Sequence, residues 1–174
     1  MATWQGYGSL VGANNYFANR LHTFHWDNAS ADDRVKANNQ AYELINMFNY
    51  EGEKKPVADL LATNAAAGTT ATEAALQAAW LTQDGEFPRG TSSTVPDQVI
   101  WAQYLISYGY LEGRVPEEDF EQLTVTSQSY GGVRQAYNRQ IEMQHIALLI
   151  PSAQAFNYLR PFFRDRNGFC LVRV

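Results

Sequence analysis

The sequence predicts a single, mainly α-helical domain: a helical bundle of three to four helices with long loops, a β-hairpin-like protrusion and an extended C-terminal tail. Two observations predict the helices: apolar residues recur at three-to-four spacing, and helix-capping residues stand just before those stretches. A change to alternating apolar and polar residues after residue 122 predicts the hairpin. The 174 residues (1–174) fit one domain, and no linker or internal repeat divides them.

Two helices are expected in the N-terminal part of the chain. Ser9 can cap a helix from Leu10 to Leu21. Ser30, followed three residues later by an acid, resembles a capping box ahead of a helix from Ala31 to Asn49. The stretch between them, His22 to Asn28, breaks the helical spacing and is expected to be irregular.

The middle of the chain, residues 53–95, is predicted to be a long insertion or loop region. One short helical turn is expected from Val57 to Ala62, and one helix from Thr72 to Thr82, with its first threonine as the cap. Small and turn-forming residues predict loops over residues 64–72 and 83–95. A long loop in a compact domain is usually functional or mobile.

Proline residues mark the remaining helices. Pro96 fits the first turn of a helix that runs to Leu111, because the missing N–H is not needed there. Pro151 and Ser152 open a last helix, which is expected to reach Phe163. Pro161 removes one hydrogen bond inside that helix, so a kink is expected there.

Two segments are predicted to be adhesive. Apolar and polar residues alternate on both sides of a Gly-Gly pair, which is typical of a hairpin. The residues assigned to a hairpin that faces a neighbouring subunit or a channel are Leu123, Val125, Tyr130, Gly131, Gly132, Val133 and Tyr137. The β-prone tail can add as a strand to a partner's sheet edge or fold back onto its own helices. It comprises Phe169, Cys170, Leu171, Val172, Arg173 and Val174.

Composition favours a surface that neighbours cover. Apolar residues make up 45% of the chain and aromatic residues 13%, whereas charged residues are only 18%, against the usual share of about a quarter. Interface cores share this pattern of few charges and many aromatics, although a monomer with an aromatic core has it too. The net charge of −5 argues against an open nucleic-acid groove, since backbone binding needs clustered Lys and Arg.

No catalytic, cofactor or metal site is predicted. His22 and His25 supply two ligands of the three or four that zinc requires, and His145 stands alone. Cys170 lies in an apolar run and is expected to pack rather than to react. Phosphate-loop, dinucleotide and nucleophile-elbow motifs are absent, so the chain is expected not to be an enzyme. No apolar segment approaches the roughly 20 residues of a membrane span.

An ordered set of short patterns resembles the head-to-tail connector (adaptor) proteins of tailed bacteriophages, some of which are labelled DnaT-like. The patterns are Tyr16-Phe17-Ala18-Asn19-Arg20-Leu21, Trp26, the capped helix from Ser30 to Phe48, Phe87-Pro88-Arg89-Gly90, Val95-Pro96, Leu159-Arg160-Pro161-Phe162-Phe163 and the tail Cys170 to Arg173. They span most of the chain. The stretch from Glu53 to Thr82 is longer than the family pattern, which leaves open a neighbouring neck component.

The resemblance implies a non-catalytic virion subunit of the neck, assembled in the host cytoplasm. Such subunits form a ring, typically a dodecamer, that lies beneath the portal protein, meets tail or neck proteins and lines the channel through which DNA passes without specific binding. It also implies that the C-terminal tail docks on the portal. The alternative is a single-stranded DNA-binding module. It would stack bases on Tyr7, Trp80 or Tyr130 beside the basic set Arg160, Arg164, Arg166 and Arg173.

Overall fold

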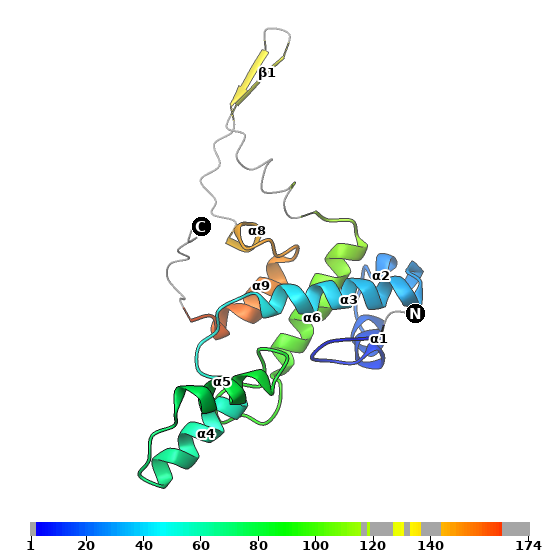
Figure 1. Cartoon of the computed structure of the whole chain (residues 1–174). Coiled ribbons are helices and arrows are strands. Elements are labelled where there is room, and N and C mark those ends of the chain that lie inside the picture. Colours follow the sequence, from blue (N-terminus) through cyan, green and yellow to red (C-terminus); the bar gives the residue numbers. More distant parts are fainter. Residues whose placement is uncertain (1–2, 116–117, 119–126, 131–132, 137–143, 165–174) are drawn as a thin grey trace.

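The computed structural model describes residues 3–115, 118, 127–130, 133–136 and 144–164, and it is mainly helical, as predicted (Figure 1). The helices are α1 (Leu10–Ala18), α2 (Phe24–Asn28), α3 (Ala31–Asn46), α4 (Lys55–Ala66), α5 (Glu73–Leu81), α6 (Asp97–Leu111), α8 (Gln144–Ala147), α9 (Ala153–Leu159) and the 3-10 helix η1 (Arg160–Phe162). The described residues thus form more helices than the three to four predicted.

Side-chain caps begin four of these helices. The hydroxyls of Ser9, Ser30, Thr72 and Ser152 each accept a hydrogen bond from the backbone N–H three residues later. Each bond satisfies a donor that the first helical turn leaves without a partner. The predicted starts of α1, α3, α5 and α9 are therefore confirmed.

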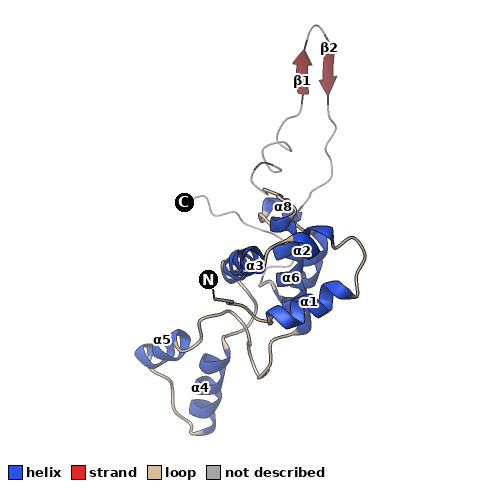
Figure 2. Cartoon of the chain, turned by 90° about the vertical axis from the view of Figure 1, so that its right-hand side faces the viewer, coloured by secondary structure: helices blue, strands red, loops and turns tan. Residues whose placement is uncertain are grey.

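The main core lies where α3 crosses α6 and α9 packs against α6 (Figures 1 and 2). Ile45, Ile106 and Leu159, one from each helix, are fully buried. Gly109 lets α9's leading segment come close, because a Cβ at this position would lie 2.8 Å from the Cβ of Pro151. This three-helix contact carries most of the apolar burial that stabilises the fold.

A second, aromatic cluster joins α1 and α2 to the other side of α6. It contains Phe17, Trp26 and Tyr104, all buried, and the Phe17 and Trp26 ring centroids are 4.5 Å apart. The indole N–H of Trp26 donates to Asn14 Oδ1 at 3.0 Å. Arg34 from α3 donates to the Trp26 carbonyl at 2.9 Å, so the cluster is tied to α3 as well.

The irregular lead-in before α1 is held between α3 and α6 by buried polar groups. Asn38 Nδ2 donates to the Gln5 carbonyl at 2.6 Å, and Gln103 Oε1 accepts from the Tyr7 N–H at 2.8 Å. Gln103 Nε2 also donates to Asn38 Oδ1 at 2.9 Å. Because buried polar groups are stable only when bonded, this network fixes the path of the lead-in.

Two predictions about the first 70 residues are wrong. The stretch from His22 to Asn28, expected to be irregular, contains α2, which is held by the burial of Trp26. The helix expected only from Val57 to Ala62 is the longer α4, which continues through part of the predicted loop over residues 64–72. Alanine is the strongest helix former, so the Ala-rich stretch extends the helix until Gly68, whose φ of +65° ends it.

Helix ends differ from prediction where proline or tertiary contacts intervene. The predicted helix up to Phe163 ends as α9 at Leu159 and continues as η1, which contains Pro161. This is the position of the predicted kink. Helix α3 ends at Asn46, three residues before the predicted Asn49, and the chain then turns toward α4.

Two short strands pair away from the helices (Figure 2). β1 (Ser127–Tyr130) and β2 (Val133–Ala136) are antiparallel, and Tyr130 lies opposite Val133. Some predicted hairpin and tail residues lie outside the described residues. They are Leu123, Val125, Gly131, Gly132, Tyr137 and the whole tail from Phe169 to Val174.

Candidate interaction surfaces

Helices α4 and α5 form a two-helix arm that projects from the core (Figures 1 and 2). Val57 is the only buried residue of α4, and α5 buries none of its residues. The two helices pack mainly on each other, so the apolar side chains of this arm are not covered by the core. The region predicted as an insertion is therefore a helical projection.

A groove of about 450 Å³ runs between α4 and α5. Seven side chains line it. We call the apolar ones its floor, namely Val57, Leu61, Leu76 and Trp80, and the polar ones its rim, namely Glu53, Glu73 and Gln77. Leu61 is 42% exposed and Trp80 48% exposed, which is high for side chains of this size. We call this feature the arm groove.

A buried charge cluster fixes the base of the arm. Lys54 is only 3% exposed, and its ammonium lies 3.2 Å from a carboxylate oxygen of Glu86. The same ammonium lies 3.8 Å from the centre of the Trp80 ring and 3.2 Å from the Gln83 carbonyl. A buried cation is tolerated only with such partners, so Lys54 ties α5 and the following loop to the start of α4.

Arg89, in the stretch Phe87-Pro88-Arg89-Gly90, completes the cluster. Its guanidinium pairs with the other carboxylate oxygen of Glu86 and donates to the Tyr50, Glu51 and Gly52 carbonyls. The backbone beside it pairs with the base of α4, since the Gly90 N–H donates to the Glu53 carbonyl at 2.8 Å. The Phe87-to-Gly90 pattern thus braces the arm.

Buried tyrosines beside this cluster are structural. The Tyr7 hydroxyl contacts Asn46 Oδ1 and accepts from the Glu86 N–H at 2.8 Å. Burial raises the pKa of Tyr7 and of Tyr50 above the usual value. Both phenols therefore keep their protons to a higher pH than an exposed tyrosine does.

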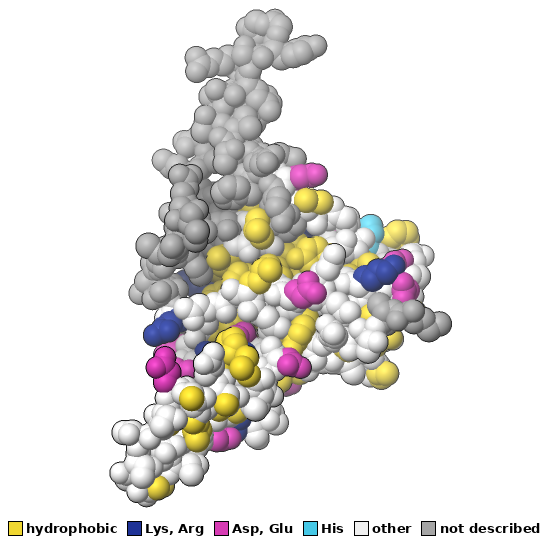
Figure 3. Space-filling view, in the orientation of Figure 1, with side chains coloured by type: hydrophobic (Ala, Val, Ile, Leu, Met, Phe, Trp, Pro, Cys, Tyr) yellow, Lys and Arg dark blue, Asp and Glu magenta, His cyan; other side chains and the backbone are white. Residues whose placement is uncertain are grey.

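A second uncovered apolar surface lies at the opposite end of the molecule, where α1 turns into α2. Leu21 is 86% exposed and Phe24 is 68% exposed. His22 adopts a φ of +61° at this turn, and the Tyr108 hydroxyl holds its carbonyl at 2.6 Å. We call Leu21, His22 and Phe24 the corner. Figure 3 shows exposed apolar side chains both on the arm and at the far end of the core.

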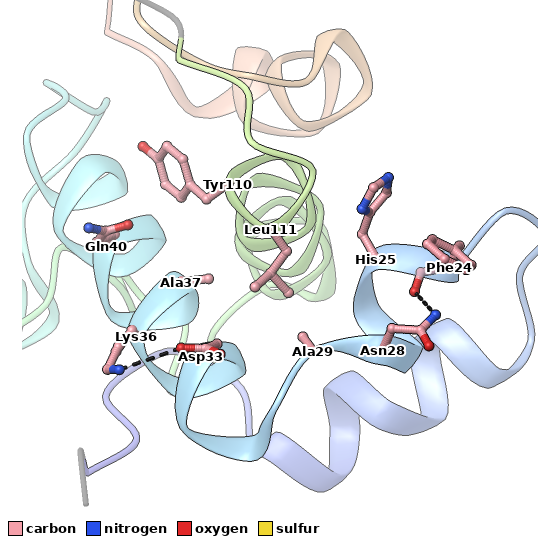
Figure 4. A pocket seen from close by; sticks show the side chains of 10 residues that line it. All are labelled: Phe24, His25, Asn28, Ala29, Asp33, Lys36, Ala37, Gln40, Tyr110 and Leu111. Carbon is pink, nitrogen blue, oxygen red and sulfur yellow. Dashed lines mark hydrogen bonds and ion pairs between the residues drawn. The ribbon is translucent and has the colours of Figure 1, made fainter.

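An open hollow of about 580 Å³ lies between α2, α3 and the end of α6 (Figure 4). His25 and Asp33 lie on opposite sides of it. The Ser30 hydroxyl and Lys36 hold the pKa of the Asp33 carboxyl below its usual value, and the His25 ring packs edge-on against Phe24. Among its polar side chains, Asn28 donates to the Phe24 carbonyl at 2.8 Å and Lys36 pairs with Asp33.

Histidine and acidic residues form no metal-binding group in the described part of the chain. Tyr7, which the single-strand hypothesis needs as an exposed base platform, has its hydroxyl bonded inside the protein. Trp80 is exposed, but Lys54 covers one face of its ring. Arg160 and Arg164 are exposed.

The sequence reasoning missed the arm groove and the corner. Leu76 and Trp80 are four residues apart on α5, so their spacing predicts an apolar side of this helix but does not say what covers it. This side stays uncovered because α5 packs mainly on α4 and not on the helices of the core. At the corner, the sequence predicts a break after Leu21 but not α2, and it gives no sign that Leu21 and Phe24 are exposed.

No described helix combines the length and the apolar character that crossing a membrane requires. Comparison with protein-family models finds no family that matches this chain, and comparisons with curated proteins and with solved structures find no match either.

Proposed function

We propose that this chain is a non-enzymatic structural subunit that assembles into a ring, as a head-to-tail adaptor beneath a bacteriophage portal. One observation carries the proposal: two different apolar surfaces, the arm groove and the corner, lie uncovered at opposite ends of the subunit. A ring repeats one contact between two unlike surfaces until it closes. A subunit with this pair of surfaces has what such a contact needs.

The chemistry of the two surfaces fits one contact. The corner offers two projecting apolar side chains, Leu21 and Phe24, and the groove offers an apolar floor. His22 at the corner can donate hydrogen bonds to the acidic rim, where Glu53 and Glu73 stand. The few charges of the chain as a whole agree with a surface that neighbours cover.

The other parts of the proposal concern segments beyond the helices. The tail from Phe169 to Val174 docks on the portal, and the hairpin from Leu123 to Tyr137 reaches a neighbouring subunit or the channel. The net charge of −5 lets DNA slide through the channel without being held. In this role the subunit belongs to the virion neck.

Electron microscopy of the protein mixed with purified portal rings tests this function. We expect a closed ring of extra density on one face of the portal. Removal of Phe169 to Val174 should abolish the attachment. A protein that remains monomeric and leaves the portal bare would contradict the proposal.

Variants of the two surfaces test the ring contact itself. Phe24→Asp should block the corner and Leu61→Asp the groove, so each variant alone should decorate the portal with isolated subunits. A mixture should form pairs, because one intact corner then meets one intact groove. Val115→Asp, which changes an exposed side chain (44%) outside both surfaces, should still close rings. Normal rings with both surface variants would show that the contact lies elsewhere.

A single-stranded DNA-binding module is the alternative. Trp80, Arg89 and Arg164 line one hollow, but Glu53 and Glu86 line it too, which weakens attraction for phosphates. Binding of labelled single strands should therefore be weak and should not fall steeply as salt rises. A steep, salt-dependent affinity would favour the alternative over the adaptor.

A further inference from the structure

The arm groove combines exposed apolar side chains with carboxylates that have no positively charged partner among the described residues. Its floor is apolar, and the carboxylates of Glu53 and Glu73 at its rim make no ion pair with any described residue. Nearby cations are already engaged, since Lys54 pairs with Glu86 and Lys55 with Asp59. The groove therefore suits an apolar segment that brings its own positive charges.

The chain leaves the described structure at the base of this groove. The Glu51 N–H donates to the Phe162 carbonyl at 2.8 Å, and the Arg164 N–H donates to the Asn49 carbonyl at 3.2 Å. Arg164 also lines one hollow together with Glu53 and Trp80, which both belong to the groove. Figure 1 shows this end of α9 and η1 beside the connection from α3 to the arm. Whatever follows Arg164 starts next to the groove.

The segment after Arg164 is long enough to cover the groove. It has ten residues, 165–174, which span at most about 33–36 Å when extended. Helix α4 has 12 residues and is therefore about 18 Å long. Half of the segment can bridge from Arg164 while the rest lies along the two helices.

The composition of the segment matches the groove. Phe169, Leu171 and Val172 are apolar, and Arg166 and Arg173 flank them with positive charge. We infer that the arm groove is the docking site of the chain's own C-terminal segment, with these apolar side chains on the groove floor and the two arginines toward Glu53 and Glu73.

The chain's own segment is favoured over that of a second copy because of tethering. A short flexible linker gives an effective concentration in the millimolar range, far above that of a separate molecule in dilute solution. The groove also belongs to the ring contact proposed above. The C-terminal segment and a neighbouring subunit then compete for the same groove. Binding of the segment by the portal would therefore free the groove for the neighbouring subunit. This last step rests on the proposed function, whereas docking of the segment does not.

The native cysteine provides a direct test. Cys170 is the only cysteine of the chain, and a disulfide needs Cβ atoms about 3.5–4.5 Å apart. In the full-length protein, Gln77→Cys places a partner thiol at the rim of the groove. Val11→Cys places one on α1, at a site that is 67% exposed and distant from the arm. Under mild oxidation at low concentration, we expect the Gln77→Cys protein to form an internal disulfide at least about tenfold faster than the control.

Non-reducing electrophoresis and peptide mass spectrometry read out the result. Equal rates for the two variants would overturn the inference. Disulfide-linked dimers from Gln77→Cys would overturn it as well, because the segment would then reach another molecule's groove. Adding Glu73→Lys to Gln77→Cys should slow closure several-fold, whereas Glu43→Lys on α3 should not. Since no portal is present, failure of this test is distinct from failure of the ring experiment. Loss of portal binding by the oxidised Gln77→Cys protein, restored by reduction, would support the proposal that the segment leaves the groove when it binds the portal.

Discussion

Helices α6 and α5 show two ways in which one chain stabilises a helix. α6 buries eight of its 15 residues, whereas α5 buries none of its nine. α6 is therefore held by packing against α3 and α9. α5 depends on the Thr72 cap, on helix-forming alanines, on contact with α4 and on the ion pair at the base of the arm. We therefore expect the core to tolerate changes of surface residues and the arm to respond to the loss of a single charge.

The largest expected effect is in the core. Ile106→Ala removes a fully buried side chain, and such changes lower the free energy of unfolding by about 2–5 kcal/mol. Leu81→Ala, on the arm, removes a side chain that is 65% exposed and should change it by less than about 0.5 kcal/mol. Urea denaturation of both variants measures the difference. Equal losses would mean that the arm is packed as tightly as the core.

The next effect concerns the base of the arm. Lys54→Met removes the buried ammonium, and Glu86 keeps only Arg89 as its charged partner. Breaking a buried pair is strongly destabilising, and with one partner left we expect a loss of about 2 kcal/mol. Hydrogen exchange should accelerate in α4 and α5 but not in α6. As a control, Lys36→Met removes an exposed cation and should leave exchange in the arm unchanged. Uniform acceleration in the first variant would show that arm and core unfold together.

A glycine in the core and one on the arm give a closer comparison. A Cβ at Gly109 would lie 2.8 Å from the Pro151 Cβ, so Gly109→Ala should destabilise the protein by about 1–3 kcal/mol through overpacking. Gly68 has a φ of +65° and open space around it, so Gly68→Ala should cost about 1 kcal/mol from backbone conformation alone. Thermal unfolding of both variants tests the order. A larger effect at Gly68 would contradict it.

The smallest expected effect is a change in the loss of stability at alkaline pH. Burial raises the pKa of Tyr16, on α1, to about 12, against a usual value of 10.0. Between these values the unfolded chain loses the proton and the folded chain keeps it, so this stability is complete below pH 10 and decreases up to pH 12. The Tyr16 hydroxyl has no hydrogen-bond partner among the described residues. Tyr16→Phe should therefore be tolerated at pH 8 and should lessen the alkaline loss of melting temperature. An unchanged alkaline slope would contradict this origin.

Local signals predicted the helix starts, and long-range contacts decided the rest. A hydroxyl at Ser9, Ser30, Thr72 or Ser152 bonds three residues ahead, so sequence alone reveals it. Helix α2 depends on the packing of Trp26 against Phe17, and the residues next to Trp26 in the sequence give no sign of this contact. The length of α4 was underestimated because small residues offer no apolar stripe, although alanine itself favours helix.

The candidate surfaces were the least predictable part. Whether Leu61 or Trp80 is buried depends on how α4 and α5 stand relative to the core, and that depends on the buried pair Lys54 and Glu86. Residues 32 positions apart in sequence carry no local pattern. Low charge and abundant aromatics favour a surface that neighbours cover, but composition alone does not locate such a surface.

The contact between Gly6 and Gln103 constrains how this protein can evolve. A Cβ at residue 6 would lie 2.2 Å from the Gln103 amide nitrogen and 3.0 Å from that of Asn38. A larger residue at position 6 requires a shorter side chain in place of Gln103. Asn38 would then lose its hydrogen bond from the Gln103 amide. We expect these three positions to change together or not at all in any homologous sequences.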